Sequence, residues 1–268
     1  IAVELVERSG FTEDVYLRPM VYLSREQLGV RLHNLESDTL IFLTPFPAYL
    51  PEVARCHTST WRRVQDTGIP PRAKVTGIYV NSALAKSEAN ANGFDEAILL
   101  FEKSARKKAG NVSEGSGENI FMVRDGRLIT PTPADNVLEG ITARSVMELA
   151  ANELGVPILQ REIDRTELYI ADEVFMTGTA AHLTPVVEVD RRPVGTGRPG
   201  PITSQLSDLF YDCIRGKSEK YRNWCTPARA RVTKQRRSFS GLHARSASSP
   251  AAARTRAACT RASRRGPA

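Results

Sequence analysis

Apolar and polar residues along this chain follow two periods, one typical of helices and one typical of strands. Residues 1–9 and 202–215 carry apolar side chains at helical spacing, which would place those side chains on one face of each helix. Residues 15–22 alternate as a half-buried strand does, and residues 39–43 predict a second strand. Gly10 follows the first helical segment, at the place where glycine commonly ends a helix.

The middle of the chain continues this mixture, and turn residues separate its elements. Residues 82–92 predict an alanine-rich helix closed by Gly93, and residues 96–101 predict a buried strand. Residues 119–130 predict a hairpin, because an Asp-Gly pair lies between two apolar runs. Further predictions are a helix over residues 143–154 with Thr142 as its cap and Gly155 as its stop, a short helix at the capping-box spacing of residues 164–167, and a strand over residues 173–177.

The mixture predicts an α/β (α+β) chain with more than one part. A proline-rich segment at residues 46–51 is expected to link a small α/β domain, of which residues 1–45 are the remainder, to a larger domain over residues 52–227. Residues 228–268 are rich in Arg, Ala and Ser and poor in large apolar side chains, so we expect them to be disordered.

Composition indicates a globular protein whose basic character is local. Apolar residues make up 41% of the chain, which is enough for a sizeable core. The formal net charge is +7, but residues 228–268 contain 11 of the 37 Lys and Arg and none of the 30 Asp and Glu. We therefore expect no nucleic-acid partner. Neither a membrane span nor a signal peptide is evident, and we expect a cytoplasmic protein. The four scattered cysteines predict reduced thiols and no metal site.

Three short segments carry side chains that could perform chemistry, and each is bounded by small residues. Lys74 precedes an apolar run at residues 77–80 that predicts a strand and contains Tyr79. Glu114 opens a glycine-rich turn, where the backbone can approach a ligand closely. The third segment, residues 177–181 (TGTAA), ends an apolar strand. Taken singly, a lysine is most often a surface charge and such a turn an ordinary connection.

Together, however, these segments fit pyridoxal 5'-phosphate. This cofactor needs a lysine for covalent attachment, an acid opposite its ring nitrogen and N–H donors for its phosphate. Lys74 and Glu114 can supply the first two. A helix that starts at residues 140–142 offers unpaired first-turn amides, and Thr179 and Ala180 can add more.

Several blocks of sequence, in the right order, resemble a bacterial branched-chain amino acid aminotransferase, a pyridoxal phosphate enzyme of fold type IV. The blocks are YVNSALA at residues 79–85, EGSGENIF at 114–121, LEGIT at 138–142, RTELYIADEVF at 165–175 and TGTAA at 177–181. The resemblance covers residues 1–227. It implies a small α/β domain followed by a larger domain with a barrel-like sheet. It also implies a homodimer or higher homo-oligomer, which exchanges the amino group of leucine, isoleucine or valine with 2-oxoglutarate.

The resemblance further implies a role for each matching residue. Lys74 matches the lysine that forms the Schiff base and shuttles a proton at the substrate Cα. Glu114 matches the acid at the pyridine nitrogen, and Tyr79 the phenol at the ring 3'-oxygen. Phosphate-binding positions are matched by Ile141, Thr142 and Thr179, the turn for the substrate α-carboxylate by Ala180, and the substrate pocket by Tyr16 and Arg18. An arginine suits the last role because its planar fork pairs with the side-chain carboxylate of glutamate.

Three features depart from the family pattern. The family has a further N-terminal segment with a phosphate-binding arginine, and this chain begins after it, so we expect weak cofactor binding and slow turnover. Residues 102–109 are longer and more basic than the usual tight turn, and they either bulge outward or disturb Glu114. Residues 228–268 match nothing in the family, and a shifted reading frame would produce such a composition.

Other functions remain open on sequence alone. A D-amino acid aminotransferase or an aminodeoxychorismate lyase shares the implied fold. A basic nucleic-acid-binding protein would account for residues 228–268 but not for the cofactor blocks. An inactive truncated remnant is the third alternative.

Overall fold

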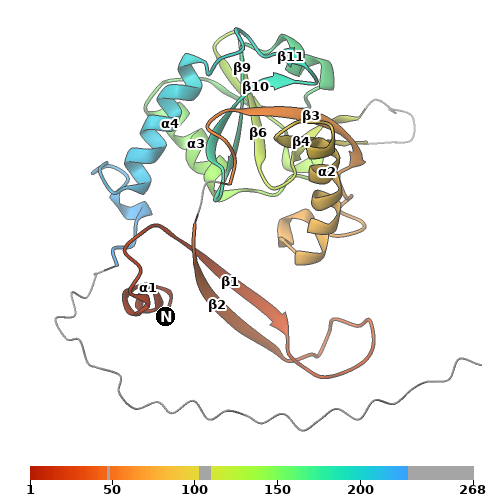
Figure 1. Ribbon diagram of the computed structural model, residues 1–268, viewed down its shortest axis with the longest axis vertical. Helices are drawn as coiled ribbons and strands as arrows, with labels where there is room; N and C mark the ends of the chain where they lie inside the picture. Colours follow the sequence, from red (N-terminus) through yellow and green to blue (C-terminus); the bar gives the residue numbers. More distant parts are fainter. Residues whose placement is uncertain (47–48, 103–109, 229–268) are drawn as a thin grey trace, which may run out of the picture. The chain divides into compact units, whose positions relative to one another are not determined.

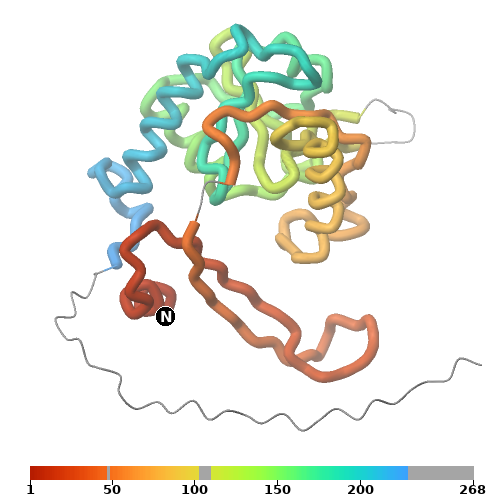
Figure 2. The backbone as a smooth tube through the Cα atoms, viewed as in Figure 1, coloured from red at the N-terminus to blue at the C-terminus, as the bar shows by residue number. Residues whose placement is uncertain are grey.

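The computed structural model describes residues 1–46, 49–102 and 110–228 of the chain (Figures 1 and 2). Three sequence predictions fall partly or wholly outside these ranges. They are the predicted linker, of which residues 47–48 lie outside, the effect of the basic segment at residues 102–109, and the disorder of residues 228–268.

The N-terminal residues form one helix and a two-stranded antiparallel sheet. Helix α1 (Ala2–Ser9) ends at Gly10, whose φ of 76° lies in the left-handed region. Strand β1 (Val15–Leu23) pairs with β2 (Ser37–Pro45), with Val15 opposite Pro45 and Leu23 opposite Ser37. The helix and both strands predicted for this part of the chain are confirmed.

In the described part of the chain, the remaining strands form one mixed sheet of nine strands. Their order is β5-β4-β3-β10-β9-β6-β7-β8, with β11 paired to β10. Strand β3 is parallel to both β4 and β10, β7 is parallel to β8, and the other pairs are antiparallel. The strands are β3 (Ala54–Arg62), β4 (Glu96–Phe101), β5 (Asn111–Gly115), β6 (Asn119–Arg124), β7 (Arg127–Thr130), β8 (Ile158–Gln160), β9 (Glu173–Gly178), β10 (His182–Val189) and β11 (Arg192–Pro193).

The sheet curls so that its edge strand β5 lies beside β6, although β4, β3, β10 and β9 separate the two in the hydrogen-bonded order. The curl follows from the chain itself, because only a tight turn joins the two strands. In that turn the Gly115 N–H donates to the Glu118 carbonyl at 2.7 Å. The expected α/β fold with a barrel-like sheet is confirmed.

Alternating side chains on the central strands bury both faces of the sheet. Ile120 and Met122 of β6 join one apolar cluster, whereas Phe121 joins a second cluster on the opposite face. Helices α3 (Ile141–Asn152) and α4 (Pro201–Ile214) cover that second face (Figure 1). A strand buried on both faces reads as a continuous apolar run, as β6 does.

Helix α2 (Tyr79–Ala91) packs on β3 and β4 through small residues. Ser82, Ala85 and Ala89 are its buried positions, at the spacing of one helical face. The predicted strand over residues 77–80 is wrong, because this helix begins at Tyr79 and the turn η2 (Thr76–Ile78) precedes it. The alanines further along the chain favour a helix strongly. The helix therefore also includes Tyr79 and Val80, the last two residues of the apolar run.

Most other predicted elements are confirmed with shifts of a few residues. They include β4, the β6–β7 hairpin, β9, α4 and the capping box of Asp164 and Glu167 at η4 (Arg165–Ile170). The predicted Thr142 cap is wrong, because Gly140 is the N-cap of α3 and Thr142 lies inside the first turn. Strands β8, β10 and β11 had no clear sequence signal, since they are short or contain Pro185 and Pro193.

The structure also bears on the predictions for the cysteines and for membrane spans. Cys56, Cys213 and Cys225 are free thiols, as the sequence predicts, and Cys259 lies outside the described residues. Among the residues that the structure describes, no helix has the length and apolar character that crossing a membrane requires.

A buried carboxylate anchors the start of α4 to the sheet and yields a stability prediction. Glu173, in β9, accepts hydrogen bonds from the Ile202 and Thr203 N–H groups at 3.0 and 2.7 Å. Such bonds to a charged group contribute about 1.5–3 kcal/mol each. We expect Glu173→Ala to lower the free energy of unfolding by about 3 kcal/mol in urea denaturation. The control Glu148→Ala, on the exposed face of α3, should unfold like the parent, and equal midpoints for both variants would contradict the anchoring role.

Candidate active site

The turns before α2 bring Lys74 against Tyr79. Lys74 follows the turn η1 (Pro71–Ala73) in the left-handed conformation, with φ 51°, and donates its N–H to the Pro71 carbonyl at 3.4 Å. A non-glycine residue in this conformation is uncommon and often marks a functional position. The Lys74 Nζ donates a hydrogen bond to the Tyr79 Oη at 3.0 Å. The predicted amine and phenol are therefore neighbours.

Glu114 is a buried acid with a dedicated positive partner. It lies in β5 and is 5% exposed. Its Oε1 lies 2.6 Å from an Nη of Arg63, and its Oε2 accepts hydrogen bonds from the Leu138 N–H at 2.8 Å and the Asn119 Nδ2 at 3.4 Å. Burial raises the pKa of Glu114 to about 7, although Arg63, the Leu138 N–H and Lys74 all favour the charged form.

The N-terminus of α3 supplies amides to the same place. Gly140 is the N-cap, and a Cβ built there would lie 2.1 Å from the Asn119 Oδ1, so a side chain at this position would displace the Asn119 amide. Ile141 and Thr142 follow in the first turn, where N–H groups have no partner within the helix and the helix dipole favours an anion. Thr179 lies in the turn between β9 and β10.

One cavity of about 240 Å³ is lined by six of the nine predicted site residues. They are Lys74, Tyr79, Glu114, Ile141, Thr142 and Thr179. Thr179 also lines a second cavity, of about 1110 Å³, together with Ala180 and Tyr16. Arg18 lines neither cavity, and its guanidinium carbon lies 4.9 Å from the centre of the Tyr16 ring.

Sequence reasoning missed four residues that line the smaller cavity. Arg63 and Asn119 bind Glu114, and Ser82 and Thr177 have buried hydroxyls without a hydrogen-bond partner among the described residues. Arg63 carried no local signal, because its partner lies 51 residues further along the chain. Asn119 was visible only as part of the EGSGEN block.

A second buried acid, Glu118, lies beside this cavity in a different setting. Its Oε2 accepts the Gly117 N–H at 3.1 Å, and it is 4% exposed. Glu96, which is fully buried, forms an ion pair with Lys86. Burial raises the pKa of Glu118 to about 8, and the negative charge of Glu96 acts in the same direction. The ammonium of Lys86 is paired with Glu96, so burial and the charge of Glu96 both favour the protonated form of Glu118.

Comparisons with known proteins agree on one family. The family model described as amino-transferase class IV matches residues 1–189. A protein of Aquifex aeolicus named probable branched-chain-amino-acid aminotransferase is 48% identical over 229 residues, which are 85% of this chain and 72% of that protein. The branched-chain-amino-acid aminotransferase of Pseudomonas aeruginosa is 40% identical over 230 residues, covering 84% of this chain and 72% of its own length.

Solved structures give the same result. The branched-chain aminotransferase of Thermoproteus uzoniensis with norvaline is 45% identical, with a TM-score of 0.79 over 85% of this chain and 73% of that one. The branched-chain amino acid aminotransferase of Thermobaculum terrenum, solved in its PLP-form (holo-form), is 38% identical, with a TM-score of 0.78 over 85% of this chain and 73% of that one.

The raised pKa of Glu118 predicts a measurable link between pH and stability. The folded protein keeps this proton up to about pH 8, whereas the usual value of 4.5 applies to the unfolded chain. The contribution of the protonated Glu118 carboxyl to the stability of the fold is therefore complete below pH 4.5, and it is lost as pH rises toward 8.

We expect Glu118→Gln, whose side chain stays neutral, to unfold like the parent at pH 4.5 and to become more stable than the parent by pH 8.5. At about 1.4 kcal/mol per pKa unit, the difference should reach a few kcal/mol. Melting curves across this pH range measure it. Parallel pH profiles for the parent and Glu118→Gln would refute a proton on Glu118, and the exposed control Glu148→Gln should follow the parent.

Proposed function

This chain belongs to the class IV aminotransferase family, and on that premise we propose that it transfers the amino group of leucine, isoleucine or valine to 2-oxoglutarate. The products are the corresponding 2-oxo acid and glutamate. The observation that carries the proposal is a single cavity lined by Lys74, Tyr79, Glu114 and the start of α3. The names of the relatives support the choice of branched-chain substrates.

The residues of this cavity fit pyridoxal 5'-phosphate, the cofactor of the family. An amine, a phenol and a buried acid line it together with helix amides, and the hydroxyls of Ser82 and Thr177 have no partner among the described residues. Lys74 would hold the cofactor covalently, and Glu114 would face its ring nitrogen. Its phosphate would lie at the first turn of α3 and at Thr179, where N–H groups favour an anion.

The chain's own residues then have distinct tasks. When bound, pyridoxal phosphate supplies the electron sink that makes the substrate Cα acidic. The Lys74 amine takes the proton from Cα and returns one during amine transfer. Tyr79 orients that amine through the bond of 3.0 Å. Glu114 stabilises positive charge at the ring nitrogen, and Arg63 favours the ionised state of Glu114.

We assign the substrate side chain and carboxylates to the larger adjoining cavity. Ala180 lies next to Thr179, which lines both cavities, and would receive the substrate α-carboxylate. Tyr16 lines the larger cavity, and the Arg18 guanidinium is positioned over the Tyr16 ring at 4.9 Å. Arg18 itself lines neither cavity, and we propose that its guanidinium pairs with the side-chain carboxylate of glutamate when the substrate lies beside Tyr16.

We also propose that the active protein is a cytoplasmic homodimer or higher homo-oligomer with two domains. The separate two-stranded and nine-stranded sheets support a division into residues 1–45 and 52–227, joined by residues 46–51. Sedimentation of the purified protein with cofactor tests the assembly. A monomer that turns over at the full rate would refute it.

The assignment of Lys74 predicts where the cofactor becomes attached. Borohydride reduction in the presence of pyridoxal phosphate should fix the cofactor on the peptide that contains Lys74, and Lys74→Ala should abolish both this label and the amine transfer from L-leucine to 2-oxoglutarate. Peptide mass mapping reads the first result and an amino-acid assay the second. The control Lys217→Ala, at an exposed ion pair with Asp212, should keep both. A label on a different lysine of the parent would refute the assignment of Lys74 as the attachment site.

The two buried acids should differ in catalysis. Losing the Glu114 carboxylate removes the partner of the ring nitrogen, so Glu114→Gln should slow amine transfer by about 100-fold or more, by analogy with the loss of one electrostatic catalytic contact. Glu118→Gln should change the rate much less, because its amide resembles the protonated acid. Rates with L-leucine, L-valine and D-alanine at saturating cofactor compare the variants and test the substrate class. The reverse ranking of the two variants would show that Glu118 is the acid at the ring.

A further inference from the structure

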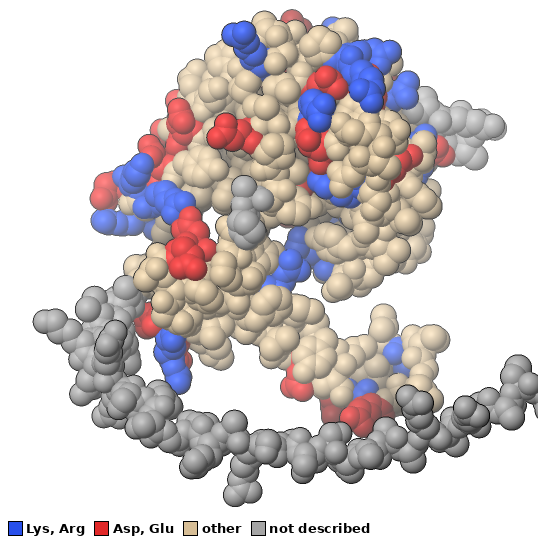
Figure 3. All heavy atoms as spheres, in the orientation of Figure 1, with Lys and Arg blue, Asp and Glu red and all other residues tan. Residues whose placement is uncertain are grey.

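A second polar pocket, of about 360 Å³, shares no lining residue with either cavity of the proposed active site. Its walls come from β3, the turn between β10 and β11, and η4, together with the residues that follow α2. Lys and Arg side chains gather near β11 on this part of the surface (Figure 3). A volume of this size can hold a small molecule.

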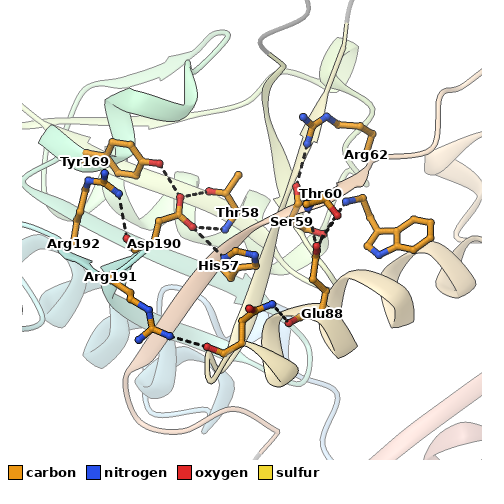
Figure 4. A network of polar contacts seen from close by, with 12 residues as sticks. His57, Thr58, Ser59, Thr60, Arg62, Glu88, Tyr169, Asp190, Arg191 and Arg192 are labelled. Carbon is orange, nitrogen blue, oxygen red and sulfur yellow. Dashed lines mark hydrogen bonds and ion pairs between the residues drawn. The ribbon is translucent and has the colours of Figure 1, made fainter.

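The one acid in the pocket, Asp190, already has its full set of partners. Its carboxylate accepts hydrogen bonds from the Thr58 N–H, the Thr58 hydroxyl and the Tyr169 hydroxyl, each at 2.7 Å, and lies 3.4 Å from the His57 Nδ1 (Figure 4). Burial opposes its ionisation, but the bonds from Thr58 and Tyr169 hold the pKa of Asp190 below its usual range. Asp190 therefore organises the pocket and has no capacity left for nearby arginines.

Three guanidinium groups surround this centre, and most of their donors are unused. Arg191 donates to the Asn92 carbonyl at 3.0 Å and Arg192 to the Asp190 carbonyl at 3.1 Å, whereas no hydrogen bond from Arg165 is found among the described residues. None of the three forms an ion pair with a carboxylate of the described chain. A guanidinium carries five N–H donors, so most of these remain free for a ligand.

Aromatic rings hold the guanidiniums in place. The guanidinium carbon of Arg191 lies 5.0 Å from the centre of the Phe94 ring, and those of Arg192 and Arg165 lie 4.6 and 6.0 Å from the Tyr169 ring. Stacking of this kind restricts a side chain that would otherwise be mobile. The three guanidiniums are exposed, but each one is stacked on a ring that limits its movement.

The backbone at Arg191 indicates that an arginine is kept there against local preference. Asp190 and Arg191 form the two-residue turn between β10 and β11, with φ 50° and 62°. Asp125 and Gly126 make the same kind of turn between β6 and β7, with φ 50° and 69°. Glycine adopts this conformation without strain and arginine does not. Non-glycine residues with such strain cluster at functional positions.

From these observations we infer that the pocket of Arg165, Arg191 and Arg192 binds a small dianion, either a phosphate group or a pair of carboxylates. Three positive groups against one saturated acid leave a net charge of about +2, which two negative charges of the ligand would balance. Guanidinium forks pair with the oxygens of either group. The inference is independent of the transaminase proposal, since it uses no residue of that site.

The hairpin turn provides a test in which stability and binding should move in opposite directions. Arg191→Gly places the favoured residue of such turns at this position, so its melting temperature should equal or exceed that of the parent. Its affinity for the dianion should fall at least about tenfold, the effect of losing one charge-assisted contact. Arg165→Gln should weaken binding similarly. The control Arg222→Ala removes an equal charge from an exposed pair with Glu219 and should bind like the parent.

Isothermal titration of the pyridoxal phosphate-loaded protein measures these affinities, because the cofactor then occupies the phosphate-binding amides of α3. Inorganic phosphate and succinate are the two probes, titrated at constant ionic strength with chloride as the reference. Binding of either probe by the parent, with loss in Arg191→Gly and Arg165→Gln, supports the site, and the probe that binds identifies the group recognised. No binding of either probe, or binding that is unchanged in Arg191→Gly, would overturn the inference.

Discussion

The buried ion pair of Arg63 and Glu114 ties together segments that are far apart in the chain. Arg63 directly follows β3 and Glu114 lies in β5, and β4 separates these two strands in the sheet. The same two side chains bind the backbone before α3, since Arg63 donates to the Asn136 carbonyl at 3.2 Å and Glu114 accepts from Leu138 at 2.8 Å. Removing one partner of a buried pair leaves an uncompensated charge, at a cost of about 3–5 kcal/mol. The site therefore depends on both partners.

The position of the loop before α3 depends on this pair. The loop that Arg63 and Glu114 bind leads directly to Gly140, where the helix begins. A second link is the exposed bond from the Arg72 Nε to the Glu139 Oε1 at 2.7 Å, but exposed pairs contribute little. The buried pair thus holds the loop before α3 against β3 and β5, and the exposed pair links that loop to the turn before Lys74.

The sequence was informative where a local rule determines the structure. The Asp-Gly turn between β6 and β7, the capping box at Asp164 and the helix end at Gly10 each follow from a few neighbouring residues. The EGSGEN block likewise led to Glu114. The predictions of Thr142 as a cap and of a strand at residues 77–80 were wrong because each helix begins earlier than the local pattern indicates. Gly140 caps α3, which includes Thr142, and α2 begins at Tyr79.

Such local rules do not predict contacts between residues that are far apart in the sequence. Arg63 pairs with Glu114, and Thr58 with Asp190, 132 positions away. The residues around Arg63 and Thr58 do not indicate which distant side chain either of them contacts. The strands that make these contacts possible are also the ones with weak patterns, since β10 contains a proline and β3 alternates only in part. The pairing of β3 with β10 depends on the arrangement of the whole curled sheet rather than on the pattern of residues within these two strands.

Glu114 and Glu118 show how a partner, rather than residue type, determines the role of an acid. They lie in one motif four positions apart, and both are buried. Glu114 has a guanidinium 2.6 Å away and a backbone N–H, so positive charge arriving at the cavity finds an acid that can ionise. Glu118 has no such partner, and burial and the negative charge of Glu96 raise its pKa, while the ammonium of Lys86 is paired with Glu96. Arg63 favours ionisation of Glu114 and Glu96 opposes ionisation of Glu118, so residues outside the motif account for the difference between the two acids.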